Sequence, residues 1–127
     1  MAGEPMELVY ANSKIRNQCT SLIAASKLFG GQKGLAISLH ARVNALKQAP
    51  NIKDIIVQKQ FRFHQLNHFK GKPETFFAID VKTKRDPWRL ILRPLDNDKK
   101  PFKPCYIDQI AQFVEIVEIA EVSKHYE

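Results

Sequence analysis

The spacing of apolar residues changes part-way along the chain, and this change constrains the fold more than any other feature. Between Asn12 and Gln48, apolar residues recur every three or four positions, as they do on one face of a helix. After residue 75, short runs rich in β-branched and aromatic residues follow instead, as in strands. Helices followed by strands predict an α+β domain.

The helical part reads as an antiparallel pair. Either Asn12 or Ser13 can cap a first helix, whose apolar stripe runs to residue 29 and is ended by the "GG" pair at 30–31. A second helix is expected over residues 33–48, and Pro50 ends it. The short "GGQKG" connection predicts that the two helices form a hairpin with one shared apolar face.

The second part reads as a small, mostly antiparallel sheet. Residues 75–81 and 88–93 alternate between two faces and predict two strands, and the short run at 6–10 is a candidate first strand. Residues 113–122 carry a glutamate at every third position, which fits helix or strand, but their β-branched content favours a strand. The residue 94–104 segment, with its three prolines, is expected to be a loop. We expect the helices to cover one face of the sheet and to leave the other for function.

Composition narrows the classes of protein. The 127 residues are 44% apolar and predict one domain over 1–127, while a net charge of +7 favours a polyanion or an acidic partner. No apolar run is long enough for a membrane span, and the N-terminus does not read as a signal peptide. Cys19 and Cys105 form no CxxC pair, so a reducing cytoplasm is the expected location. No metal-ligand signature, P-loop or GxGxxG sequence is present, and no cofactor is expected.

A basic and aromatic stretch over residues 59–72 is the first candidate site. Its Arg62, Lys70 and Lys72 can hold phosphates by charge, and its aromatic rings can stack on bases. His64 lies in the middle of this stretch, and histidine can act as an acid or a base near neutral pH. The alternative is that His64 is an ordinary surface residue in a loop.

Two further pairs complete the candidate set. Arg89 and Arg93 share one strand face and can clamp phosphate oxygens, although they also fit a solvated strand face. His125 and Tyr126 end the last predicted strand, and they also fit a docking tail for a partner. A base, an acid and a cation are what metal-independent RNA cleavage by the 2′-OH requires.

The order of these pieces resembles the RelE/ParE toxin superfamily, and most closely its HigB-like branch, the plasmid-maintenance killer proteins. A Leu-His-x-Leu-x-Gly motif of that branch is matched by "FHQL" at 63–66, with extra residues before Gly71. Its Trp-Arg pair is matched by Trp88 and Arg89, and its Asp-Tyr-His-like ending is matched loosely by residues 123–126. The acid of that ending is absent here, and Glu121 or Glu127 is the available substitute.

The resemblance implies the toxin of a type II toxin–antitoxin system, an endoribonuclease that cuts mRNA in the ribosomal A site without a metal. It also implies a HigA-like antitoxin as partner. The implied roles are proton transfer by His64 and His125, stabilisation of the scissile phosphate by Arg89 with Arg93, stacking or proton transfer by Tyr126, and phosphate binding by Arg62, Lys70 and Lys72. The alternatives are a ParE-like inhibitor of DNA gyrase and a non-catalytic RNA-binding or adaptor protein.

Overall fold

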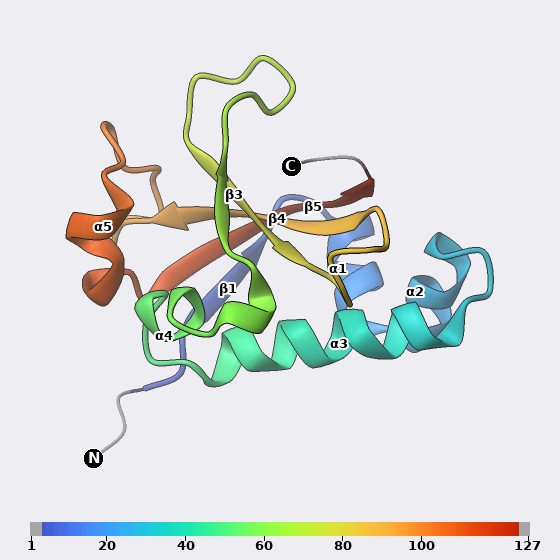
Figure 1. Cartoon of the computed structure of the whole chain (residues 1–127). Coiled ribbons are helices and arrows are strands. Elements are labelled where there is room, and N and C mark those ends of the chain that lie inside the picture. Colours follow the sequence, from blue (N-terminus) through green and yellow to red (C-terminus); the bar gives the residue numbers. More distant parts are fainter. Residues whose placement is uncertain (1–3, 125–127) are drawn as a thin grey trace.

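A five-stranded mixed sheet forms the centre of the molecule in the computed structural model, which describes residues 4–124 (Figure 1). The strand order is β1-β5-β4-β3-β2. The first strand, β1, pairs in parallel with β5, and the other neighbours pair antiparallel. The strands are β1 (Glu7–Tyr10), β2 (His64–Leu66), β3 (Phe76–Asp80), β4 (Trp88–Leu95) and β5 (Ile116–Lys124).

Helices precede most of the sheet and lie on one of its sides, so the predicted α+β class is confirmed. The long helix α3 (Lys33–Gln48) runs along that side, next to α1 (Ser13–Thr20) and α2 (Leu22–Leu28) (Figure 1). The connection from α2 to α3 turns at Gly30 and Gly31, which take φ of +63° and +88°. Glycine adopts this left-handed conformation without a Cβ clash, as the predicted hairpin requires.

The first predicted helix is in fact two helices. Ser21 takes an extended conformation, with φ −119° and ψ 121°. Its N–H donates to the Asn17 carbonyl oxygen at 2.8 Å and ends α1, and its hydroxyl accepts from the Ala24 N–H at 3.2 Å and caps α2. The prediction of one continuous helix to residue 29 is therefore wrong at Ser21, where a hydroxyl offers the backbone a competing partner.

The sheet extends further than the alternation predicted. Strand β4 continues through Pro94 to Leu95, so the segment predicted as a loop from residue 94 begins as strand. Strand β5 begins at Ile116, three residues later than the expected strand over 113–122, and Phe113 instead ends a 3₁₀ turn over Ala111–Phe113. The remaining short elements are α4 (Lys53–Ile56), a 3₁₀ turn at Lys59–Phe61 and α5 (Ile107–Ile110).

The core lies between the helices and the sheet. Leu39 and Leu46 of α3 are fully buried against Ile79, Leu90 and Ile119 of the central strands. A second, smaller apolar cluster lies on the opposite side of the sheet, under the β2–β3 connection that rises away from α3 (Figure 1). It contains Leu66, Phe69, Phe76, Ala78 and Ile91. Within residues 4–124, no helix combines the length and the apolar content that a membrane crossing requires.

Candidate functional site

The sheet face opposite α3, called the open face below, carries most of the candidate residues. Directly opposed residues on neighbouring strands point to the same face. His64 of β2 opposes Ala78, Ala78 opposes Ile91, and Ile91 opposes Glu121 of β5. Because Ala78 and Ile91 belong to the small apolar cluster, His64 and Glu121 flank that cluster from two different strands.

Two guanidinium groups share one buried carboxylate at the end of β3. The Arg62 Nε donates to the Asp80 Oδ2 at 3.0 Å, and its Nη2 lies 3.0 Å from Oδ1. The Arg89 Nε lies 3.2 Å from the same Oδ1. Asp80 is 2% exposed, so the two cations neutralise a charge that water cannot reach.

Arg89 lies deeper than the sequence suggested. It is 2% exposed, and it donates further hydrogen bonds to the carbonyl oxygens of Asp86 at 2.7 Å and Trp88 at 2.8 Å. The Arg89 side chain therefore stabilises the turn over residues 82–88 by hydrogen bonds and forms an ion pair with Asp80. It is not presented to solvent as a phosphate clamp would be.

Arg62 determines the hydrogen-bonding state of His64. Arg62 takes a left-handed conformation, with φ 50° and ψ 49°, which is uncommon outside glycine and found repeatedly at functional sites. Its carbonyl oxygen lies 2.7 Å from the His64 Nδ1. A carbonyl only accepts, so Nδ1 carries the proton and the neutral ring keeps its lone pair on Nε2. This Nε2 is buried and has no hydrogen-bond partner within residues 4–124.

Lys70 reaches the open face from the β2–β3 connection. Its ammonium forms an ion pair with Glu121, and it also lies 5.6 Å from the centroid of the Phe69 ring. Lys70 shares the left-handed conformation, with φ 53°. Its side chain is 52% exposed, so it can reach a ligand as well as Glu121. Lys72 lies nearby, with its ammonium 5.9 Å from the centroid of Phe76.

Arg93 lies on the same face of β4 as Arg89 but has its own carboxylates. Its Nε donates to the Glu118 Oε1 at 2.7 Å, and its Nη1 lies 3.5 Å from a Glu74 oxygen. The two arginines therefore do not converge on one point. Asp80 and Glu118 were missed in the sequence analysis. A carboxylate on the same strand face as an arginine of the next strand was the available signal.

Two further titratable side chains, on helix α3, contact the backbone of neighbouring elements. His40 of α3 lies 3.1 Å from the Gln18 carbonyl oxygen and ties α3 to α1. Arg42 of α3 donates to the Asp80 carbonyl oxygen at 3.0 Å, and burial lowers its pKa from the usual value. No group of three or more His, Cys, Asp or Glu side chains is arranged to hold a metal ion in the described chain. His125 and Tyr126 lie outside the described residues.

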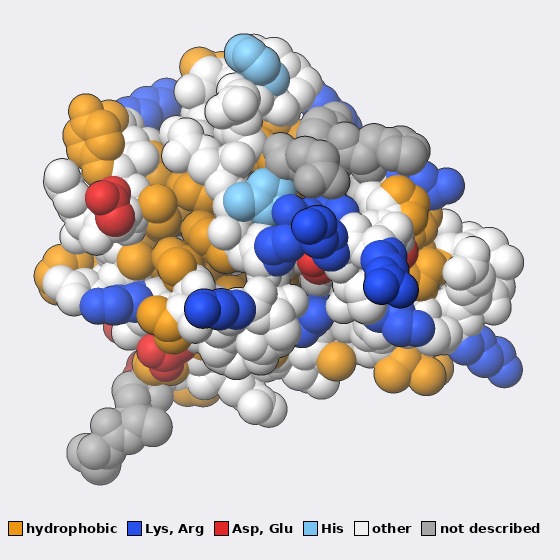
Figure 2. All heavy atoms as spheres, viewed as in Figure 1, with side chains coloured by type: hydrophobic (Ala, Val, Ile, Leu, Met, Phe, Trp, Pro, Cys, Tyr) orange, Lys and Arg blue, Asp and Glu red, His pale blue; other side chains and the backbone are white. Residues whose placement is uncertain are grey.

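The space-filling view shows lysine and arginine side chains gathered beside a histidine in the middle of the visible face (Figure 2). Hydrophobic side chains form a separate area beside them. The visible face thus places cations beside an apolar area. On the open face, cations also lie against aromatic rings, Lys70 against Phe69 and Lys72 against Phe76. Cations beside aromatic rings are typical of surfaces that contact single-stranded nucleic acid.

Comparisons with known proteins leave the chain without an assigned family: no family model matches it, and neither the curated proteins nor the solved structures give a match.

Proposed function

We propose that this protein is a ribosome-dependent mRNA endoribonuclease that acts as a type II toxin, with its active site on the open face. The observation that carries the proposal is the state of His64. Its Nδ1–H donates to the Arg62 carbonyl oxygen, which leaves Nε2 as a base. Histidine in this state can remove the proton of an RNA 2′-OH.

The surrounding charges support the same chemistry. Arg62 is 30% exposed on its side chain, and Asp80 and Arg89 hold it beside His64. In this proposal Arg62 and Lys70 meet the phosphates, and Arg89 acts as a positioning residue through Asp80. Arg62 therefore takes the role that the sequence analysis gave to Arg89, because its guanidinium is the one that reaches solvent.

The remaining roles follow the resemblance in sequence. His125 is the proposed second proton carrier and Tyr126 its neighbour, both beyond the described residues. In this proposal Lys72 and Arg93 contribute positive electrostatic potential where the flanking phosphates bind. The proposed partners are mRNA, the ribosome and a HigA-like antitoxin, and the proposed location is the cytoplasm.

Primer extension on an mRNA tests the proposal. The purified protein is incubated with that mRNA in the presence and absence of programmed ribosomes. We expect cuts at A-site codons only with ribosomes. His64→Ala should lower the cleavage rate by about 10²- to 10⁴-fold, as for loss of a general base.

His68→Ala is the matched control, because His68 lies four residues further on in the exposed β2–β3 connection and should leave cleavage unchanged. Full cleavage by His64→Ala would contradict the role of this histidine. RNA that is bound with a steep salt dependence but stays intact would indicate a non-catalytic RNA-binding protein. Loss of gyrase supercoiling would indicate the ParE-like alternative.

A further inference from the structure

Among the described residues, the outer edge of β1 has no neighbouring strand from Leu8 to Tyr10, and just before it the Met6 N–H donates to the Ala49 carbonyl oxygen at 2.9 Å. The Glu7 N–H donates to the Glu115 carbonyl oxygen at 2.9 Å, and the Ala11 N–H donates to the Ile119 carbonyl oxygen at 3.1 Å. In a parallel ladder alternate residues face the same neighbour, so the backbone groups of Leu8 and Tyr10 point away from β5. Within residues 4–124, no strand pairs with this edge.

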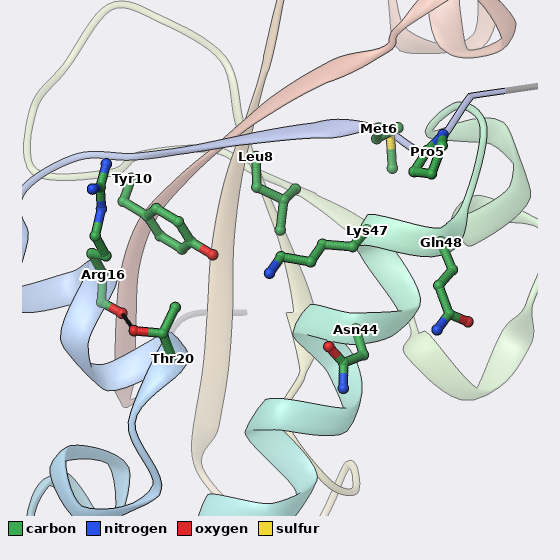
Figure 3. A pocket seen from close by; sticks show the side chains of 9 residues that line it. All are labelled: Pro5, Met6, Leu8, Tyr10, Arg16, Thr20, Asn44, Lys47 and Gln48. Atoms are coloured by element: carbon green, nitrogen blue, oxygen red, sulfur yellow. Dashed lines mark hydrogen bonds between the residues drawn. The ribbon is translucent and has the colours of Figure 1, made fainter.

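A groove of about 610 Å³ lies beside this edge, between β1, α1 and α3. Figure 3 shows the side chains of Leu8 and Tyr10 reaching from β1 toward α3, and the side chain of Lys47 extending from α3 toward them. The side chains of Met6 and Leu8 make part of the lining apolar. A strand that paired with β1 would place alternate side chains over this lining.

Two cations and one unsatisfied hydroxyl are among the polar groups of the groove. Arg16 of α1 and Lys47 of α3 contribute positive charge to its lining. The Arg16 guanidinium lies 5.6 Å from the centroid of the Tyr10 ring. The Tyr10 hydroxyl is buried and has no hydrogen-bond partner among the described residues. A buried hydroxyl of this kind is costly unless a partner satisfies it.

We propose that this groove and edge bind an extended, acidic segment of a partner protein by strand addition to β1. The backbone of the segment pairs with Leu8 and Tyr10, an apolar side chain covers the apolar lining, and flanking carboxylates meet Arg16 and Lys47. A carboxylate or carbonyl oxygen of the segment accepts from the Tyr10 hydroxyl. A basic or purely apolar segment would leave two cations and a phenol without partners.

The place of the groove separates it from the open face. β1 and β2 form opposite edges of the sheet, and Leu8 and Tyr10 pack on the helix side. A segment bound at β1 therefore leaves the open face uncovered. The inference stands independently of the proposed nuclease, because none of its residues takes part in that chemistry.

Fluorescence anisotropy with a labelled heptapeptide tests the proposal. In this probe two glutamates and a central valine alternate with four threonines, so that Glu, Val and Glu share one face of a strand. We expect saturable binding, and a version with lysines in place of the glutamates should not bind. Lys47→Glu should weaken binding about five- to tenfold. Lys33→Glu, on the same helix but outside the groove, should leave binding unchanged.

N-methylated peptides test backbone pairing directly. One peptide is methylated on the Glu, Val and Glu nitrogens and the other on the threonine nitrogens. We expect one of them to lose at least about tenfold in affinity and the other to bind like the parent, because alternate N–H groups face β1. Loss in the first indicates an antiparallel segment, and loss in the second a parallel one.

Three results would overturn the proposal. The first is no binding of the parent peptide up to about 2 mM, a concentration at which even weak recognition is visible. The second is equal behaviour of the two methylated peptides, whether both bind or both fail. The third is a concentration-dependent dimer in sedimentation that Lys47→Glu abolishes, which would assign the groove to a second copy of the chain.

Discussion

Asp80 offers the sharpest test of how the open face is held together. Its carboxylate accepts from Arg62 and pairs with the buried guanidinium of Arg89. Asp80→Ala removes this carboxylate from a site where both Asp80 and Arg89 are 2% exposed. Breaking a buried ion pair by removing one partner costs about 3–5 kcal/mol in the free energy of unfolding.

The ion pair between Asp80 and Arg62 contributes much less to the free energy of unfolding than the pair between Asp80 and Arg89. Arg62 is 30% exposed on its side chain, and an ion pair in contact with water is worth about 1 kcal/mol or less. Arg62→Ala should therefore cost about 1 kcal/mol. The double variant with Asp80→Leu and Arg89→Met should be more stable than Asp80→Leu alone by at least about 1 kcal/mol, because both buried charges are then absent.

Urea unfolding followed by the fluorescence of Trp88, the single tryptophan, measures all of these variants. A loss of about 4 kcal/mol moves the midpoint by about 2 M urea for a slope of about 2 kcal/mol/M. Asp80→Asn is the matched variant, because it keeps the shape and removes the charge. A loss below about 1 kcal/mol for Asp80→Ala, with an unchanged slope, would refute the reasoning.

Three further predictions concern the helices and the helix-side core. Burial raises the pKa of the Cys19 thiol from 9.0 to about 12, so its alkylation by iodoacetamide at pH 8 should be about a thousandfold slower than that of an unperturbed thiol. The pKa of Cys19 is higher in the folded state than in the unfolded state. The buried, protonated thiol therefore contributes its full stability below pH 9, and this contribution is lost as the pH rises toward about 12. Urea unfolding across this range should show the loss, and Cys19→Ala should remove this part of the pH dependence. Asn12→Ala should cost about 1 kcal/mol in thermal unfolding, since Asn12 Oδ1 caps α1, whereas Asn17→Ala should cost little. Gly31→Ala should cost about 1 kcal/mol because the φ of Gly31 is +88°, whereas Gly34→Ala in α3 should stabilise the protein by up to about 1 kcal/mol. Circular dichroism melts measure both variants, and the opposite order of stability would contradict the backbone argument.

The local pattern of apolar residues predicted most of the helices and strands, but it predicted few of the contacts in the candidate site. Periodicity identified α3 and the strands β3 and β4, because each presents one regular face to a common core. It missed the break at Ser21, where a hydroxyl caps a new helix and no glycine or proline marks the position. The strand character of His64 was also missed, because β2 is three residues long and depends on pairing with β3.

The candidate site depends on register, which a sequence pattern does not contain. Arg89 is buried because Asp80 opposes it on β3, and its deep position follows from this pairing. The extra residue in β5 opposite Ile91 and Leu92 shifts the later pairs, so that Glu118 meets Arg93. These contacts join residues far apart in sequence and appear only when the strands are aligned.

The parallel pairing of β1 with β5 has a consequence for the order in which this chain can fold. Leu8 pairs with Val117, so partners in neighbouring strands lie 109 positions apart in the sequence. Closing a loop of this length costs about 4 kcal/mol of chain entropy before any contact repays it. During synthesis, helices α1 to α3 emerge long before β5, the strand that fills the gap between β1 and β4. In that interval the edges of β1 and β4 that β5 will later cover have no partner strand, so the sheet can close only after residue 116 and beyond are available.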